Sequence, residues 1–157
     1  MKFGSFTSFG AGLLLSASAA LSGGAAMAAG DDIETRETST AYADVTQAVQ
    51  DAIVNRGYTI DYHGFIGEML KRTAGDVGAS KELYKDAEFF TFCSAVVSRH
   101  VIEADIGDIA YCPYVVFVYE NAATPGTTTV GFRHLPAGEE RDKVNALLTE
   151  IIEEAAE

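Results

Sequence analysis

The chain has 157 residues, 48% of them hydrophobic, and carries 11 basic against 23 acidic residues, a net charge of −12. A field of that sign repels phosphate backbones, which argues against nucleic acid as a partner and favours a solvated surface or docking to a basic protein. The two cysteines are 19 residues apart, which excludes the Cys-x-x-Cys motifs of thioredoxin-like proteins, zinc ribbons and covalent haem attachment.

The first 28 residues predict a cleaved secretory signal peptide. Lys2 is their only charge, an apolar run spans residues 11–21, and Ala26-Met27-Ala28 places small residues where an export peptidase cleaves. The run is too short and too rich in Ser, Gly and Ala to cross ~30 Å of hydrocarbon. We therefore expect a periplasmic or secreted protein that has no membrane anchor after cleavage. Residues 29–157 are then long enough for a single domain.

The first half of this domain predicts strands and a helix in alternation. Residues 33–38 alternate in the manner of a strand, and apolar residues at helical spacing predict a helix over 41–56. Gly57 follows where helices commonly end in glycine. Period-two alternation over 58–63 predicts a second strand.

That second strand is expected to place Tyr58, Ile60 and Tyr62 on one face and His63 on the other. Residues 65–78 fit either a short helix or a glycine-rich loop, the kind of connection in which lids occur. A further helical turn is expected within 81–86.

The second half of the domain predicts a strand over 89–92, then a helix that Ser94 caps and that runs to about 104. Residues 111–119 are apolar on both alternating sets, which indicates a strand in the centre of a sheet. Another strand is predicted over 127–135, with Val130 and Phe132 on one face.

The last segment, residues 139–155, predicts an amphipathic helix with apolar residues at steps of three and four. Its stripe must be covered by the sheet or by a second subunit, and we expect a homodimer. The predicted order is β-α-β-β-α-β-β followed by this helix. Strands and helices do not alternate throughout, so we expect a single compact α+β domain with a mostly antiparallel sheet and two main helices.

Cys93 is the strongest candidate for chemistry. It lies where a predicted strand meets a predicted helix, and backbone N–H groups and the helix dipole stabilise a thiolate there. His100 follows two helical turns later on about the same side, ~10 Å along the axis. Contact between the two side chains therefore needs a bridging ion or ligand. Cys112 comes close to Cys93 if their strands are neighbours.

Three hypotheses follow for Cys93 and Cys112. Export favours a structural disulfide. A thiol activated by a helix start favours a redox-switching pair, or a soft transition-metal site that includes His100. Free cysteine also packs well in a core without a partner. No motif requires a cofactor, since no nucleophile elbow, phosphate-binding glycine loop or His-Glu-x-x-His occurs. His63 and His134 are the other histidines available as a base.

Four stretches of the chain carry a resemblance to a known family. They are Arg56-Gly57-Tyr58, Phe92-Cys93, Ala104-Asp105 and Cys112-Pro113-Tyr114, and the last leads into Val116 to Glu120. In these stretches the chain resembles the bacterial family catalogued as domain of unknown function 302. The resemblance covers about residues 35–135 and leaves the helix over 139–155 as an addition. Ser94-Ala95 stands where many members have Asn-Pro, so the chain resembles an exported subgroup. The resemblance implies a compact α+β domain, a homodimer and no established activity.

Together these features predict a small exported binding or accessory protein. Its site is centred on Cys93 and Cys112, with His100 as a third candidate, and serves a ligand, a metal ion or thiol–disulfide switching. One alternative is an enzyme that uses Cys93 as its nucleophile. Another is a structural or interaction module with a Cys93–Cys112 disulfide, whose acidic face docks a basic partner.

Overall fold

A five-stranded sheet organises the residues that the computed structural model describes, 32–157. Its strand order is β1-β5-β4-β3-β2, and every neighbouring pair is antiparallel. The predicted α+β class with an antiparallel sheet is therefore confirmed. The predicted signal peptide, residues 1–28, lies outside the described residues.

Ten elements follow one another along this part of the chain. They are β1 (Ile33–Thr38), α1 (Tyr42–Asn55), β2 (Ile60–Gly64), α2 (Ile66–Thr73), β3 (Tyr84–Phe92), α3 (Ala95–Ala104), the 3-10 helix η1 (Ile106–Tyr111), β4 (Tyr114–Asn121), β5 (Thr128–Arg133) and α4 (Glu139–Ala156). The predicted order is present, with α2 and η1 as short additions in the connections. Within these residues, no helix combines the length and the apolar character needed to cross a membrane.

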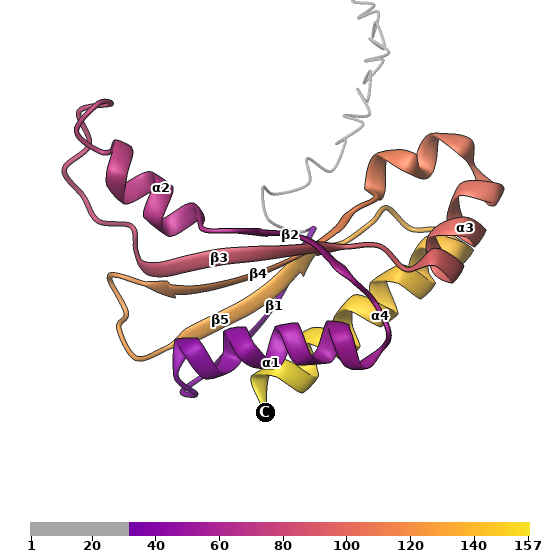
Figure 1. Cartoon of the computed structure of the whole chain (residues 1–157), viewed down its shortest axis with the longest axis horizontal. Helices are drawn as coiled ribbons and strands as arrows, with labels where there is room; N and C mark the ends of the chain where they lie inside the picture. Colours follow the sequence, from indigo (N-terminus) through magenta and orange to yellow (C-terminus); the bar gives the residue numbers. More distant parts are fainter. Residues whose placement is uncertain (1–31) are drawn as a thin grey trace, which may run out of the picture.

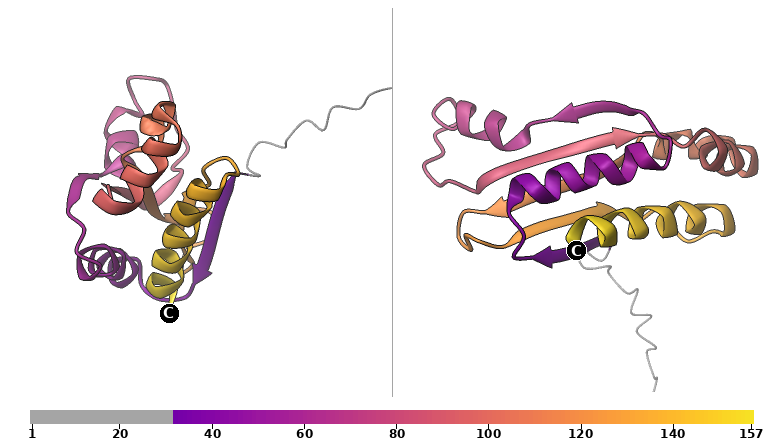
Figure 2. Two further views of the ribbon diagram at one scale, coloured as in Figure 1. Left: turned by 90° about the vertical axis from the view of Figure 1, so that its right-hand side faces the viewer. Right: turned by 60° about the horizontal axis from the view of Figure 1, so that its bottom comes forward.

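Helices α1 and α4 cover the same face of the sheet and lie side by side across it (Figures 1 and 2). The core between these helices and the sheet consists of fully buried apolar side chains, among them Val49, Ile53, Phe90, Phe132, Leu148 and Ile151. Burying each such side chain contributes about 1.5–3 kcal/mol. The apolar stripe of α4 is thus covered by its own chain, and it no longer requires a second subunit.

No described helix crosses the centre of the opposite face of the sheet (Figure 1). Aromatic rings lie over this open face instead. The ring of Phe117 lies so close above Gly131 that a Cβ at that position would come within 2.7 Å of its Cζ atom. Phe117 also stacks on Tyr119, with ring centroids 6.1 Å apart. Gly131 is therefore the residue that lets the ring lie flat on the sheet.

A β-bulge changes the predicted faces of β2. Ile60 lies opposite Phe92, but Tyr62 lies opposite Thr91, so the register shifts at Asp61. The expectation that Tyr58, Ile60 and Tyr62 share one face is therefore wrong, because the extra residue sends Tyr62 to the open face. The same shift places His63 opposite Phe90, on the face that the helices cover.

Two predicted boundaries are also corrected. The third strand begins at Tyr84 rather than residue 89, because its first half pairs with the end of β4, and no helical turn forms over 81–86. The fourth strand begins at Tyr114 rather than residue 111, because η1 continues to Tyr111 and Cys112 N donates to Ile109 O at 3.2 Å. Cys112 consequently lies in the link between η1 and β4.

Candidate functional site

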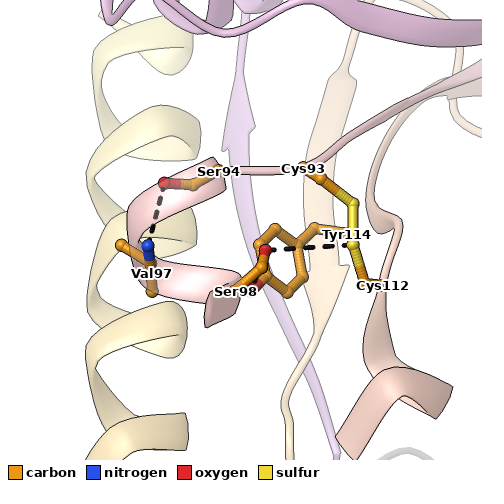
Figure 3. The surroundings of a disulfide bond; sticks show 6 residues. All are labelled: Cys93, Ser94, Val97, Ser98, Cys112 and Tyr114. Atoms are coloured by element: carbon orange, nitrogen blue, oxygen red, sulfur yellow. Dashed lines mark hydrogen bonds between the residues drawn. A yellow bond between two sulfur atoms is a disulfide. The ribbon is translucent and has the colours of Figure 1, made fainter. Parts of the chain in front are cut away.

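A disulfide joins Cys93 to Cys112 (Figure 3). The two Cα atoms are 6.2 Å apart, within the ordinary span of such a bond. The bond ties the end of β3 to the segment that precedes β4, and both cysteines are half-buried. The predicted pairing is confirmed, and the alternative of two unpaired core cysteines is not what the structure shows.

The residues around the disulfide are fixed by hydrogen bonds. Ser94 caps α3 as predicted, its hydroxyl accepting from Val97 N at 3.3 Å. The Ser98 hydroxyl bonds with the Tyr114 hydroxyl at 2.9 Å and lies 3.8 Å from Cys112 Sγ (Figure 3). Burial raises the pKa of Tyr114, and the bond from Ser98 offsets this only in part. Tyr114 therefore stays a neutral phenol beside the sulfur.

His100 does not join the two sulfurs. It is exposed on α3, and within residues 32–157 no three His, Cys, Asp or Glu side chains are gathered in a way that could hold a metal ion. A metal thiolate also needs free sulfurs, which the disulfide removes. For the same reason, a nucleophilic role for Cys93 requires prior reduction.

His134 lies at the other side of the same end of the sheet, where its Nε2 bonds with Glu34 Oε2 at 2.7 Å. Glu34 also accepts from Arg36 at 2.8 Å and from the Thr149 hydroxyl. Burial raises the pKa of Glu34, but the hydrogen bonds from His134, Arg36 and Thr149 outweigh it and hold that pKa below its usual value. His134 is therefore part of a network that joins β1 to α4.

A cleft of about 880 Å³ lies between these two regions. It starts on the open face of the sheet and passes round the end where β4 begins and β5 stops. Its apolar wall includes Ala110, Tyr111, Pro113, Val115, Phe117 and Leu135. Arg133, His134 and Asp32 supply its polar edge, and Arg133 Nε pairs with Asp32 Oδ2 at 3.2 Å.

One buried ion pair holds the η1 side of the cleft in place. Arg141, from α4, donates to both carboxylate oxygens of Asp108, at 2.8 and 2.7 Å. Its guanidinium also lies over the Tyr111 ring, 5.7 Å from the centroid. Bidentate pairs of this kind fix geometry as well as charge. Tyr111, a wall residue, is thereby attached to α4.

His63 lies at a different site. Its Nε2 contacts Glu88 Oε2, and its ring lies between Phe65 and Phe90, with centroids 4.3 and 4.2 Å away. The ring nitrogen that could serve as a base is therefore engaged by Glu88. Its partner Glu88 was not identified from the sequence, because an isolated acid between apolar strand residues carries no motif.

Most of the cleft residues were also missed. Arg133 is the last residue of β5 and Asp32 directly precedes β1, and each gives no more signal than any surface charge. The one usable signal was the Tyr111-Cys112-Pro113-Tyr114 cluster, whose two aromatic residues flank the second cysteine. Three of those residues, Tyr111, Pro113 and Tyr114, line the cleft next to the disulfide.

Comparisons with known proteins identify a similar fold. No family model matches the chain, and no curated protein matches it. Among solved structures, the crystal structure of an uncharacterised conserved DUF302 protein from Bacillus stearothermophilus is similar, with a TM-score of 0.65. The match covers 80% of this chain and 98% of that chain at 15% identity, so it shows a DUF302-like fold and nothing about activity. The predicted resemblance is therefore confirmed for the fold.

Proposed function

We propose that this chain is a small exported ligand-binding protein whose ligand occupies the cleft beside the Cys93–Cys112 disulfide. The observation that carries the proposal is the cleft itself. Its volume of about 880 Å³ and its apolar wall with a few polar groups at the edge are typical of small-molecule sites.

The chemistry of the cleft favours an apolar or aromatic anion. Tyr111, Pro113 and Phe117 offer an apolar surface, and Arg133 offers a positive charge at its edge. The ion pair of Arg133 with Asp32 is exposed, and such pairs contribute little. A carboxylate or sulfonate on the ligand can therefore replace Asp32 at little cost.

Through the disulfide, the affinity of the cleft for its ligand is expected to depend on the redox state of the two cysteines. Cys112 directly precedes Pro113, and the bond to Cys93 fixes this part of the wall against β3. Reduction frees Cys112 and the connection that contains η1. The thiol state is thereby expected to change the affinity of the cleft without either sulfur contacting the ligand.

Export is part of the proposal and is supported by the apolar run and the Ala26-Met27-Ala28 sequence. The mature protein is expected to begin at about Ala29 and to accumulate outside the cytoplasm. Intact mass of the exported material tests this, and a full-length, membrane-retained product speaks against it.

A homodimer is also proposed, with a second copy on the open face of the sheet. Outside the cleft, this face carries Tyr62 and Tyr119 and few charges, so two acidic chains meet there with the least repulsion. In a dimer with a two-fold axis, this patch of one subunit contacts the same patch of the other. Light scattering at micromolar concentration is expected to give twice the chain mass, and a monomer mass throughout excludes the dimer.

Fluorescence of anilinonaphthalene sulfonate, an aromatic anion, tests the ligand proposal. The folded protein is expected to bind it saturably, and Val115→Glu is expected to weaken binding at least tenfold by placing a negative charge in the cleft. Val77→Glu is the matched control, since Val77 is exposed beyond α2 at the opposite end of the sheet. Equal binding by both variants contradicts the proposal.

A further inference from the structure

A second cavity lies at the opposite end of the sheet, next to the buried carboxylate of Glu88. Figure 1 shows α2 and α3 at the two ends of the long axis, and this cavity lies between α2, β3 and the start of α1. Its volume is about 480 Å³, and its lining includes Tyr42, Phe65, Glu68, Lys85, Asp86 and Glu88.

The backbone creates this cavity where β2 ends. β2 pairs only with Phe89 to Phe92, so the first half of β3 has no strand on that side. Helix α2 takes the place of the strand. At Gly67 it lies so close to β3 that a Cβ there would come within 2.8 Å of Ala87 N. Because α2 packs beside β3 without pairing with it, it leaves a space next to β3 that a paired strand would fill.

Glu88 is the polar centre of the cavity. Only 8% of its side chain is exposed, and an uncompensated carboxylate at that depth costs several kcal/mol. His63 contacts one of its oxygens from β2, and Tyr42 approaches from α1. Burial, followed by the interaction with Glu88, raises the pKa of Tyr42, so the phenol stays protonated.

A second buried polar group lies beside Tyr42. The Thr46 hydroxyl is inaccessible and, within residues 32–157, has no hydrogen bond of normal geometry. It is nevertheless close enough to the Tyr42 phenol to lower that group's pKa. A buried hydroxyl without a partner is uncommon in folded proteins, and here it stands next to a wall of the cavity.

The charges that face the cavity are predominantly negative. Lys85 is engaged by Glu120 at 2.8 Å, and Lys71 lies 3.9 Å from Glu82. Glu68 and Asp86 form no ion pair within residues 32–157. Lys85 is therefore occupied and the exposed Lys71 is only loosely paired, so the three carboxylates of Glu68, Asp86 and Glu88 face two ammonium groups.

We propose that this cavity binds a small organic cation, an ammonium group attached to an aromatic or alkyl body. The ammonium group bonds with Glu88 and is attracted by Asp86 and Glu68. The apolar body lies against the rings of Tyr42 and Phe65, which also attract a cation. The strongly acidic chain adds long-range attraction for such a ligand.

Helix α2 can also provide a ligand with access to the cavity. Helix α2 contains no buried residue, so little packing holds it over the cavity. Gly75 and Gly78 follow it, and Gly78 has a positive φ of 67°. Segments with few buried contacts open at low free-energy cost. Movement of α2 away from β3 therefore admits a ligand without disturbing the core. The site is independent of the anion-binding cleft proposed above.

Calorimetric titration of the purified protein with three probes of the same shape tests this inference. Benzylammonium is expected to bind saturably at one site, benzyl alcohol at least tenfold more weakly, and benzoate not at all. Glu88→Gln is expected to weaken benzylammonium binding at least tenfold, and Phe65→Leu, which removes one of the two rings, several-fold. Glu103→Gln, an exposed substitution on α3 with the same charge change, is expected to bind as the wild type does.

The inference is overturned if benzoate or benzyl alcohol binds as tightly as benzylammonium, if Glu88→Gln keeps wild-type affinity, or if no probe saturates. Circular dichroism melts check that each variant is folded. Should Glu88→Gln fail to fold, Asp86→Asn and Phe65→Leu decide, because unchanged affinity in both excludes the site. Binding of anilinonaphthalene sulfonate by the same variants should stay intact, which separates this site from the cleft.

Discussion

Cys93 and Cys112 lie with their Cα atoms 6.2 Å apart, joined by a disulfide that attaches the segment before β4 to the end of β3. The bond closes a loop that contains α3 and η1. It therefore fixes an irregular connection that forms part of the wall of the proposed ligand cleft, and it makes the redox state of the protein relevant to the proposed binding.

Loss of the disulfide is expected to destabilise the fold. Closing a loop over a separation of 19 residues restricts the unfolded chain by about 3 kcal/mol. The double variant Cys93→Ser, Cys112→Ser should therefore lower the free energy of unfolding in urea by about that amount. Reduced wild type should match the variant, and reductant should not affect the variant. Superimposable curves for oxidised and reduced wild type contradict this expectation.

In the reduced protein, Cys93 is expected to react at lower pH than Cys112. Cys93 directly precedes the Ser94 cap of α3, where the helix start stabilises a thiolate. Cys112 follows the last turn of η1, where the carbonyl groups at the helix end disfavour a thiolate. Iodoacetamide labelling between pH 5 and 9, with peptide mass mapping, measures both. Equal profiles, or earlier labelling of Cys112, show that the helix start does not activate Cys93.

Gly131→Ala is expected to destabilise the sheet by about 1–3 kcal/mol through overpacking. The new Cβ would meet the backbone carbonyl oxygen of Glu34, Phe117 Cζ at 2.7 Å and Thr35 Cγ2 at 2.8 Å. Gly75→Ala is the control, because a Cβ there has nothing within 4 Å. Urea denaturation should separate the two variants. If Gly131→Ala is as stable as Gly75→Ala, neither β1 nor the ring of Phe117 packs as closely on Gly131 as described.

Glu34 is expected to make stability depend on pH. Its folded-state pKa lies below the usual 4.5, because bonds from His134, Arg36 and Thr149 outweigh the effect of burial. The stabilisation it provides is therefore complete above about pH 4.5 and is lost as the pH falls through the folded-state pKa.

Urea denaturation of wild type and Glu34→Gln from pH 3 to 7 measures this effect. The difference in free energy of unfolding should be largest at neutral pH and shrink in acid. Glu37→Gln, at an exposed position of the same strand, should show no such trend. A difference that is constant with pH indicates that the bonds to Glu34 do not depend on its charge.

The elements with strong periodicity were predictable from the sequence. The helices over 41–56 and 139–155 match α1 and α4 to within one residue at each end, because their apolar faces pack on one sheet. The strand over 127–135 matches β5 with its faces correctly assigned. In these segments local pattern and tertiary burial agree, so the pattern was sufficient.

The sequence was insufficient where backbone irregularity decides. The bulge at Asp61 is set by pairing with β3, and it moves Tyr62 and His63 to faces that strict alternation does not predict. η1 extends through Tyr111, the first residue of the predicted strand, so β4 begins three residues later than predicted. Both effects depend on partners that are distant in sequence.

Part of the candidate site was predictable as well. The position of Cys93 before a helix followed from local signals, whereas its closeness to Cys112 was expected only if their strands were neighbours. The cleft did not, because it forms where the start of β4, the end of β5 and the start of β1 meet. Glu88 and His63 likewise come together only through the β2–β3 register. Sites made by several distant segments leave no motif.

Mapping where anilinonaphthalene sulfonate binds tests the central claim most directly. In ¹⁵N-labelled protein, titration with this anion should shift the backbone amides of residues 110–115 and 133–137, which border the cleft. Pro113 and Pro136 give no amide signal. Amides of 85–88, at the other cavity, should stay unchanged. Shifts confined to any other surface, or no saturable shifts, would contradict the proposal that this protein binds its ligand beside the disulfide.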